Sequence, residues 1–196
     1  MLTTKIESVA SHHPAQIVRP YEIIEDAGLI NLDVPKTHIE DLTGIKTMHY
    51  ASAEMRPSDI AKLAIEKCLQ DFSGNEAEID AVFFCGMTRD MQEPSTAHIL
   101  NHHCGLSARF CIDIADACHG FMAGLITADA LIRSGAFRNI LVCTGEVASK
   151  GTHHIANRFK KGELGINDVK HNLGAFTVGD AGGAMILGPA DDGTGF

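Results

Sequence analysis

One short segment, residues 109–135, constrains the fold most, because a strand-like run there turns into a helix through an elbow of small residues. Residues 109–114 are rich in β-branched and aromatic side chains. An amphipathic segment begins at Cys118 and runs to Ser134, and Gly135 follows as a C-cap. Unpaired backbone N–H groups at a helix N-terminus favour a thiolate. We therefore expect Cys118 to be a reactive nucleophile, although a lone cysteine is more often buried and structural.

The remaining sequence alternates between strand-like and helix-like runs. Apolar runs predict further strands at residues 5–10, 79–85, 139–144 and 177–187. Helical patterns predict one helix from Ser58, as its N-cap, to about residue 71, and another from Pro94 to about residue 104. Residues 150–171 are polar and contain glycine, which predicts a surface excursion. Strands separated by helices indicate an α/β fold with a mostly parallel sheet.

Composition excludes several classes of protein. The chain has 196 residues, 45% of them hydrophobic and 21% charged, which is enough for one substantial core. A net charge of −9 argues against nucleic acid as the main partner. No apolar run approaches the roughly 20 residues that span a bilayer, and the N-terminal residues lack a signal-peptide pattern. Six cysteines on apolar segments indicate reduced thiols, so we expect a cytoplasmic protein without membrane contact.

Two further patterns suggest ligand sites only superficially. His98 and His102 have the i, i+4 spacing that zinc sites use, but no glutamate of an H-E-x-x-H motif accompanies them. The glycines around Asp180 lack the lysine of a phosphate-binding loop, so tight turns and a structural Asp180 are expected. We expect neither a metal site nor a cofactor.

Three longer motifs carry a family resemblance. They are D-I-A-D-A-C-H-G-F-x-x-G-L around Cys118, I-R-S-G-A-F-R-N-I-L-V-C-T-G-E-V-A-S-K at residues 132–150, and V-G-D-A-G-G-A-M-I-L at residues 178–187. Together they resemble the N-terminal half of β-ketoacyl-(acyl-carrier-protein) synthase III, a thiolase-like condensing enzyme. The resemblance extends from about residue 5 to residue 187. It implies that residues 1–196 form a thiolase-like half-domain with a mixed, mostly parallel five-stranded sheet and helices on both faces.

The resemblance also implies a reaction. Cys118 attacks an acyl thioester of CoA or of acyl carrier protein and forms an acyl-enzyme. The backbone N–H of Cys118 contributes to the oxyanion hole. Condensation with a malonyl thioester, as in fatty-acid or polyketide synthesis, needs a His and an Asn from a C-terminal half-domain. That half-domain belongs either to the same polypeptide or to a separate chain. The alternatives are a non-catalytic assembly subunit and an acyltransferase that uses a non-malonyl acceptor.

Some positions depart from the family pattern where CoA is held. His38 and Leu42 stand where the family has the Trp and Arg that contact the adenine, and this chain contains no Trp. A histidine stacks more weakly, so His38 is at most a weak CoA contact. Arg158 belongs to a small basic cluster with Lys160 and Lys161. The cluster is either solvated surface or a weak contact for CoA or an acidic carrier protein.

Four residues are candidates for binding the acyl substrate. The resemblance places Glu93 at the end of the acyl pocket, where a carboxylate disfavours a short alkyl primer, and places Met87 near its wall. Phe121 and His119 follow the nucleophile, and His119 either neighbours the thiolate or lies on the helix surface. A homodimer is expected through an edge strand, either residues 139–144 or a neighbouring strand. The loop at residues 87–94 would then reach the partner subunit's acyl tunnel.

Overall fold

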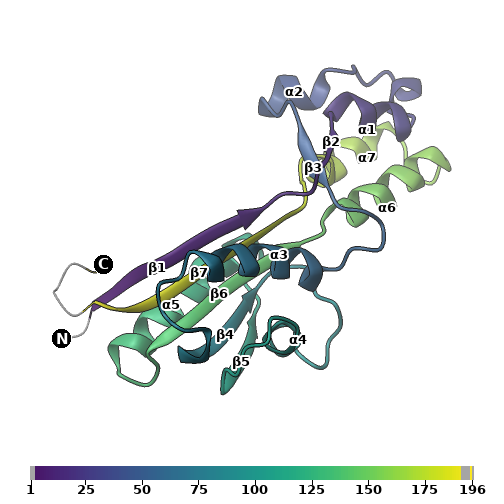
Figure 1. The fold of residues 1–196 in the computed structure, drawn as a ribbon. Coiled ribbons are helices and arrows are strands. Elements are labelled where there is room, and N and C mark those ends of the chain that lie inside the picture. The colour runs from purple at the N-terminus through teal and green to yellow at the C-terminus, as the bar shows by residue number, and fades with distance from the viewer. Residues whose placement is uncertain (1–2, 191–194, 196) are drawn as a thin grey trace. The chain divides into compact units, whose positions relative to one another are not determined.

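The computed structural model describes residues 3–190 and 195, which group into two compact units (Figure 1). The first unit combines described residues from segments 1–13, 56–146 and 181–196. The second unit combines Pro14–Met55 and Val147–Asp180. Each unit therefore depends on chain segments that are far apart in sequence.

A mixed five-stranded sheet forms the centre of the first unit. Its strands, in spatial order, are β1 (Thr3–His12), β7 (Ala181–Ala190), β6 (Asn139–Glu146), β4 (Ile79–Cys85) and β5 (Phe110–Ile114). Strand β4 pairs in parallel with both β5 and β6. Strand β7 runs antiparallel to β6 and β1, so it alone opposes the direction of the other strands. The predicted five-stranded α/β architecture is confirmed.

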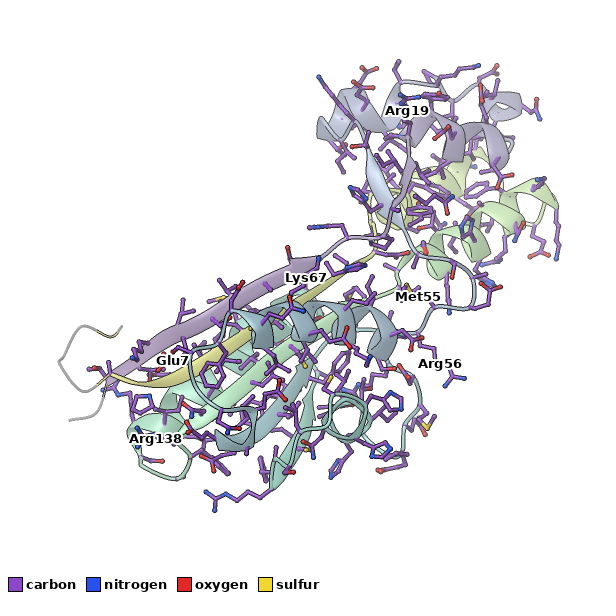
Figure 2. All side chains as sticks on the ribbon, viewed as in Figure 1. Glu7, Arg19, Met55, Arg56, Lys67 and Arg138 are labelled. Atoms are coloured by element: carbon purple, nitrogen blue, oxygen red, sulfur yellow. The ribbon has the colours of Figure 1, made fainter. Side chains whose placement is uncertain are left out.

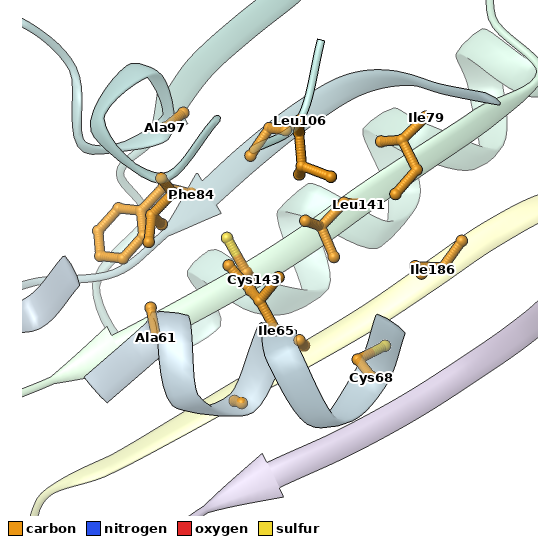
Figure 3. Close-up of a cluster of buried hydrophobic side chains, with 14 of the residues drawn as sticks. Ala61, Ile65, Cys68, Ile79, Phe84, Ala97, Leu106, Leu141, Cys143 and Ile186 are labelled. Atoms are coloured by element: carbon orange, nitrogen blue, oxygen red, sulfur yellow. The ribbon is translucent and has the colours of Figure 1, made fainter. Parts of the chain in front are cut away.

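Helices cover both faces of this sheet. On one face α3 (Pro57–Gln70) and α4 (Thr96–His103) pack against a cluster that includes Val82 and Phe84 (Figure 3). On the other face α5 (Gly120–Arg133) packs against Ala81, Phe83 and Cys85. Successive side chains of a strand point to opposite faces, and both faces of β4 are covered. The sequence of β4 is therefore one nearly continuous apolar run.

The helix starts in the first unit differ from those predicted. The N-cap of α3 is Arg56, whose side chain is exposed (Figure 2), and not Ser58. Proline at residue 57 occupies the first helical position, and the Asp59 carboxylate accepts a hydrogen bond from Arg56 N at 2.9 Å. Helix α4 begins at Thr96, with Ser95 as its N-cap, two residues after the predicted Pro94 start.

Strand order corrects the predicted edge. Residues 139–144 belong to β6, which lies between β7 and β4 and is therefore an interior strand. The two edges of the sheet are β1 and β5. The sequence prediction failed here because a buried apolar run looks the same whichever strands flank it. Strand β7 also starts at Ala181, four residues later than the predicted start.

The second unit holds a small helical core on a two-stranded sheet. Strands β2 (Gln16–Val18) and β3 (Met48–Tyr50) pair antiparallel. The helices are α1 (Pro20–Asp26), α2 (His38–Thr43), α6 (Ser149–Lys160) and α7 (Ile166–Asn172). Short 3-10 helices are η1 (Leu29–Leu32) and η4 (Leu173–Phe176) in this unit, and η2 (Glu76–Glu78) and η3 (Ala117–His119) in the first. The expectation of a surface excursion at residues 150–171 is wrong, because α6 and α7 bury Ala156, Phe159 and Val169 in this core.

Asp180 ties the second unit together. Its buried carboxylate accepts hydrogen bonds from Ala51 N at 2.7 Å, from Ser149 N at 2.8 Å and from Ser149 Oγ at 2.5 Å. The carboxylate therefore satisfies backbone donors at the end of β3 and at the first turn of α6. The predicted structural role of Asp180 is confirmed.

Residues 3–190 and 195 contain neither a membrane-spanning helix nor a cluster of metal ligands. No helix in that part of the chain has the length and apolar character to cross a membrane. No three or more His, Cys, Asp or Glu side chains there are grouped so that they could hold a metal ion.

Candidate functional site

The parallel strands β4, β5 and β6 bring three segments to one edge of the sheet. Cys85 pairs with Ile114, and Phe84 with Cys143, so the carboxyl ends of the three strands lie together. The loop after β4, the elbow after β5 and Glu146 at the end of β6 therefore meet at this edge. In open α/β sheets this edge is where ligands bind.

The elbow that carries Cys118 is a single turn of 3-10 helix, η3. Ala117 has a φ of 42°, in the left-handed region that residues with a side chain rarely adopt. Holding such a residue costs of order 1–3 kcal/mol, and such positions concentrate at functional sites. Helix α5 starts at Gly120, so Cys118 lies in the turn before the helix. The sequence had predicted instead that the helix begins at Cys118. Gly135, with φ of 75°, ends this helix as predicted.

Exposure separates Cys118 from the other cysteines. Cys118 is the one exposed cysteine of the six, all of which the structure describes. Burial raises the pKa of Cys85 to about 12 and the pKa of Cys104 to about 11. Burial also raises the pKa of each of the other three thiols, those of Cys68, Cys111 and Cys143. Those five thiols are therefore poor nucleophiles near neutral pH.

Gly124 lets α5 pack closely on β4, and Gly120 lies near the ends of the strands. A Cβ added at Gly124 would lie 2.4 Å from Cys85 Sγ, which leaves no room for a side chain. A Cβ at Gly120 would lie 3.7 Å from Ile114 O and 3.8 Å from Gly86 N. The first residue of α5 therefore rests against the ends of both β4 and β5.

The histidine that follows Cys118 lies on the surface. His119 Nδ1 is 2.9 Å from Asp116 Oδ2, and 62% of the His119 side chain is exposed. An Asp–His pair within one exposed turn contributes little to stability. The pair does give the imidazole a fixed partner at the elbow.

Three carboxylates fix the loop between β4 and α4, residues 86–95. Glu146 accepts hydrogen bonds from Met87 N at 2.7 Å and from Thr88 N at 3.2 Å. Asp90, within the loop, accepts from Ser58 N at 2.9 Å and from Ser58 Oγ at 2.6 Å. Asp113 accepts from the backbone of α4 at Thr96 and Ala97, at 2.9 Å each. None of the three was predicted from the sequence, in which the only available signal was an acidic residue near a strand end.

The other predicted substrate residues fall in two settings within the first unit. Met87, with 51% of its surface exposed, and the exposed Glu93 lie on the loop at residues 86–95. Phe121 is partly buried and packs against the core cluster under α5. The structure thus brings Met87 to the same sheet edge as the elbow, and it gives Phe121 a packing role.

The predicted CoA contacts belong to the second unit. His38 starts α2, and Leu42 follows one turn later; both line a depression of about 420 Å³ whose other wall includes Ile166 and Lys170. Arg158 Nε is 3.2 Å from Glu163 Oε2. Lys160 Nζ is likewise 3.0 Å from Asp26 Oδ1, so acids within the unit already pair with two cations of the basic cluster.

Sequence comparison finds similarity to one family of enzymes. The profile described as 3-oxoacyl-(acyl-carrier-protein) synthase III matches residues 112–196. The chain is 30% identical over 189 residues to β-ketoacyl-(acyl-carrier-protein) synthase III 1 of Lactiplantibacillus plantarum, an alignment that covers 96% of this chain and 52% of the relative. It is 32% identical over 177 residues to the synthase III of Staphylococcus aureus, covering 90% of this chain and 52% of the relative.

The chain is β-ketoacyl synthase III-like. Solved structures agree on the fold. OleA of Xanthomonas campestris with bound cerulenin is 25% identical and superimposes with a TM-score of 0.87, over 96% of this chain and 58% of that one. A variant of OleA with bound lauric acid and lauroyl-CoA shares the fold, with a TM-score of 0.88 at 24% identity over 95% of this chain and 56% of that one. The synthase III-like chain thus has a thiolase-like fold, and it spans about half the length of the curated relatives it matches.

Proposed function

We propose that this synthase III-like chain forms an acyl-enzyme thioester on Cys118 and thereby catalyses acyl transfer. The observation that carries the proposal is one exposed thiol on a strained elbow at the carboxyl edge of the parallel strands. The sulfur adds to the carbonyl carbon of an acyl thioester, and the tetrahedral intermediate collapses with loss of the carrier thiol. The proton of the Cys118 thiol leaves with that carrier.

Stabilisation of the tetrahedral oxyanion is the second part of the proposal. The backbone N–H of Cys118 is a donor of the oxyanion hole. A helix N-terminus favours negative charge, and α5 begins only two residues later. The acyl donor is acyl-CoA or an acylated carrier protein, and the names of the curated relatives support a carrier protein.

Carbon–carbon bond formation is a further step of the proposed function. We propose that condensation with a malonyl thioester needs the His and Asn of a C-terminal half-domain, in the same polypeptide or in a second chain. Without that pair, this chain supports the acylation step but not stabilisation of an enolate.

We also propose a homodimer, through the edge strand β5. Phe110 on β5 is 40% exposed, and the other residues of the strand are half-buried. An apolar edge strand left unpaired invites pairing with another strand. Sedimentation velocity at micromolar concentration tests this proposal, and a strictly monomeric protein would contradict it.

Intact-protein mass spectrometry tests the acyl-enzyme. Incubation of the full polypeptide with acetyl-CoA or octanoyl-CoA should add one acyl group, and peptide mapping should place it on Cys118. Cys118→Ala should abolish the adduct. Cys111→Ala, which removes a half-buried thiol of β5, is the matched control and should leave the adduct unchanged. An acyl group that persists in Cys118→Ala would show that the nucleophile is assigned wrongly.

A further inference from the structure

Glu146 holds the backbone that follows β4 at the sheet edge where Cys118 lies. Its Oε1 accepts a hydrogen bond from Met87 N at 2.7 Å. Its Oε2 accepts from Thr88 N at 3.2 Å and from Thr88 Oγ1 at 2.8 Å. Hydrogen bonds to an ionised carboxylate are stronger than neutral ones. Since 58 residues separate Thr88 from Glu146, this is a tertiary tie and not a local turn.

The same backbone lies near the start of α5. A Cβ built on Gly120 would lie 3.7 Å from the carbonyl carbon of Cys85 and 3.8 Å from Gly86 N. A Cβ built on Gly86 would lie 3.0 Å from Glu146 Oε1. Gly86 therefore lies near both the Glu146 carboxylate and Gly120, which is two positions after Cys118.

We propose that Glu146 is a positioning residue for the reaction of Cys118. Its carboxylate fixes residues 86–88 as a rigid wall beside the elbow, so that an acyl thioester meets a preformed surface. In this role Glu146 contacts no reacting atom and transfers no proton. The inference rests on the acyl transfer proposed above, and it adds the residue that sets the geometry of that step.

Preorganisation explains why such a tie matters for rate. A misplacement of about 1 Å in the groups around a reacting centre can cost about 100-fold in rate. The loop at residues 86–95 is also tied farther along, where Asp90 binds Ser58. Removal of Glu146 therefore frees the part of the loop beside the elbow and leaves this second tie in place.

The test compares two reactions of Cys118 in the full polypeptide. Acylation by acetyl-CoA and octanoyl-CoA depends on the wall, whereas alkylation by iodoacetamide, a small probe, does not. Glu146→Gln keeps one carbonyl acceptor, and Glu146→Ala removes every acceptor. Gly86→Ala places a Cβ 3.0 Å from the intact carboxylate and 3.1 Å from the Phe84 ring. Glu66→Gln removes a surface carboxylate that pairs with Lys62 on α3, and it is the matched control.

We expect the second-order rate constant of acylation to fall about tenfold in Glu146→Gln and about 100-fold in Glu146→Ala. Gly86→Ala should lower it in the same direction, with an altered ratio of octanoyl to acetyl transfer. Iodoacetamide should label Cys118 at nearly the same rate in every variant. Glu66→Gln should match the unmodified protein in both reactions.

Three other outcomes have distinct meanings. Unchanged acylation in Glu146→Gln and Gly86→Ala overturns the positioning role, and these two variants decide the matter if Glu146→Ala fails to fold. Equal loss of acylation and alkylation, with a lowered Tm, also overturns it, because Glu146 then only stabilises the fold. No acylation of the unmodified protein refutes the proposed function itself, which is a separate failure.

Discussion

Helix α3 lies directly on the backbone of the sheet, at a point where no side chain fits. Gly145 of β6 and Gly182 of β7 pair in register, and both face this helix. A Cβ at Gly145 would lie 2.0 Å from Pro57 O and 2.9 Å from Ala61 N, whereas real Cβ atoms essentially never approach closer than 3.0 Å. Gly145→Ala therefore forces the helix about 1 Å away from the sheet.

Overpacking a core costs about 1–3 kcal/mol and sometimes more, and here the clash is with backbone, which cannot swing aside. We expect Gly145→Ala to lower the free energy of unfolding by about 3 kcal/mol. For a protein of this size, that corresponds to a fall in Tm of about 6–12 °C. Thermal denaturation followed by circular dichroism measures it.

A second glycine provides the control. Gly151 lies within α6, and a Cβ there would meet nothing within 4 Å. Gly151→Ala should raise stability by about 0.5–1 kcal/mol, because alanine loses less backbone entropy in a helix. If Gly145→Ala melts within about 2 °C of the unmodified protein, the packing argument for α3 is wrong.

Two further predictions concern pH and substrate. Burial raises the pKa of Cys85 from 9.0 to about 12, so above pH 9 the unfolded chain loses this proton and the folded protein keeps it. The stability that this group contributes is present below pH 9 and is lost as the pH rises towards 12. Between pH 8 and pH 10, the free energy of unfolding in urea should therefore fall in both proteins, but by about 1 kcal/mol less in Cys85→Ala than in the unmodified protein. Equal declines in the two proteins would contradict the link between Cys85 burial and stability. Glu93→Phe should speed acylation of Cys118 by acetyl-CoA and octanoyl-CoA relative to the unmodified protein, because it removes a charge at the proposed pocket end. An unchanged rate profile would show that Glu93 is ordinary surface charge.

Much of the local structure follows from the sequence alone. The strand at residues 79–85 has the predicted bounds, and β5 starts one residue after its predicted start. The helix after Cys118 ends at Arg133, one residue before the predicted Ser134, and Gly135 follows with the positive φ that the glycine signal indicated. These features depend on neighbours along the chain, such as alternating burial, small residues at a turn and a glycine with positive φ. A local pattern is enough to specify them.

Other features needed the tertiary structure. The sequence did not show that residues 139–144 lie inside the sheet, because strand order depends on pairing between distant segments. It placed residues 150–171 on the surface, since the partners that bury Phe159 and Val169 come from elsewhere in the chain. The Glu146 tie to Met87 and Thr88 was equally invisible. Its donors are backbone N–H groups, which every residue but proline carries, so only the folded arrangement decides which of them meet a carboxylate.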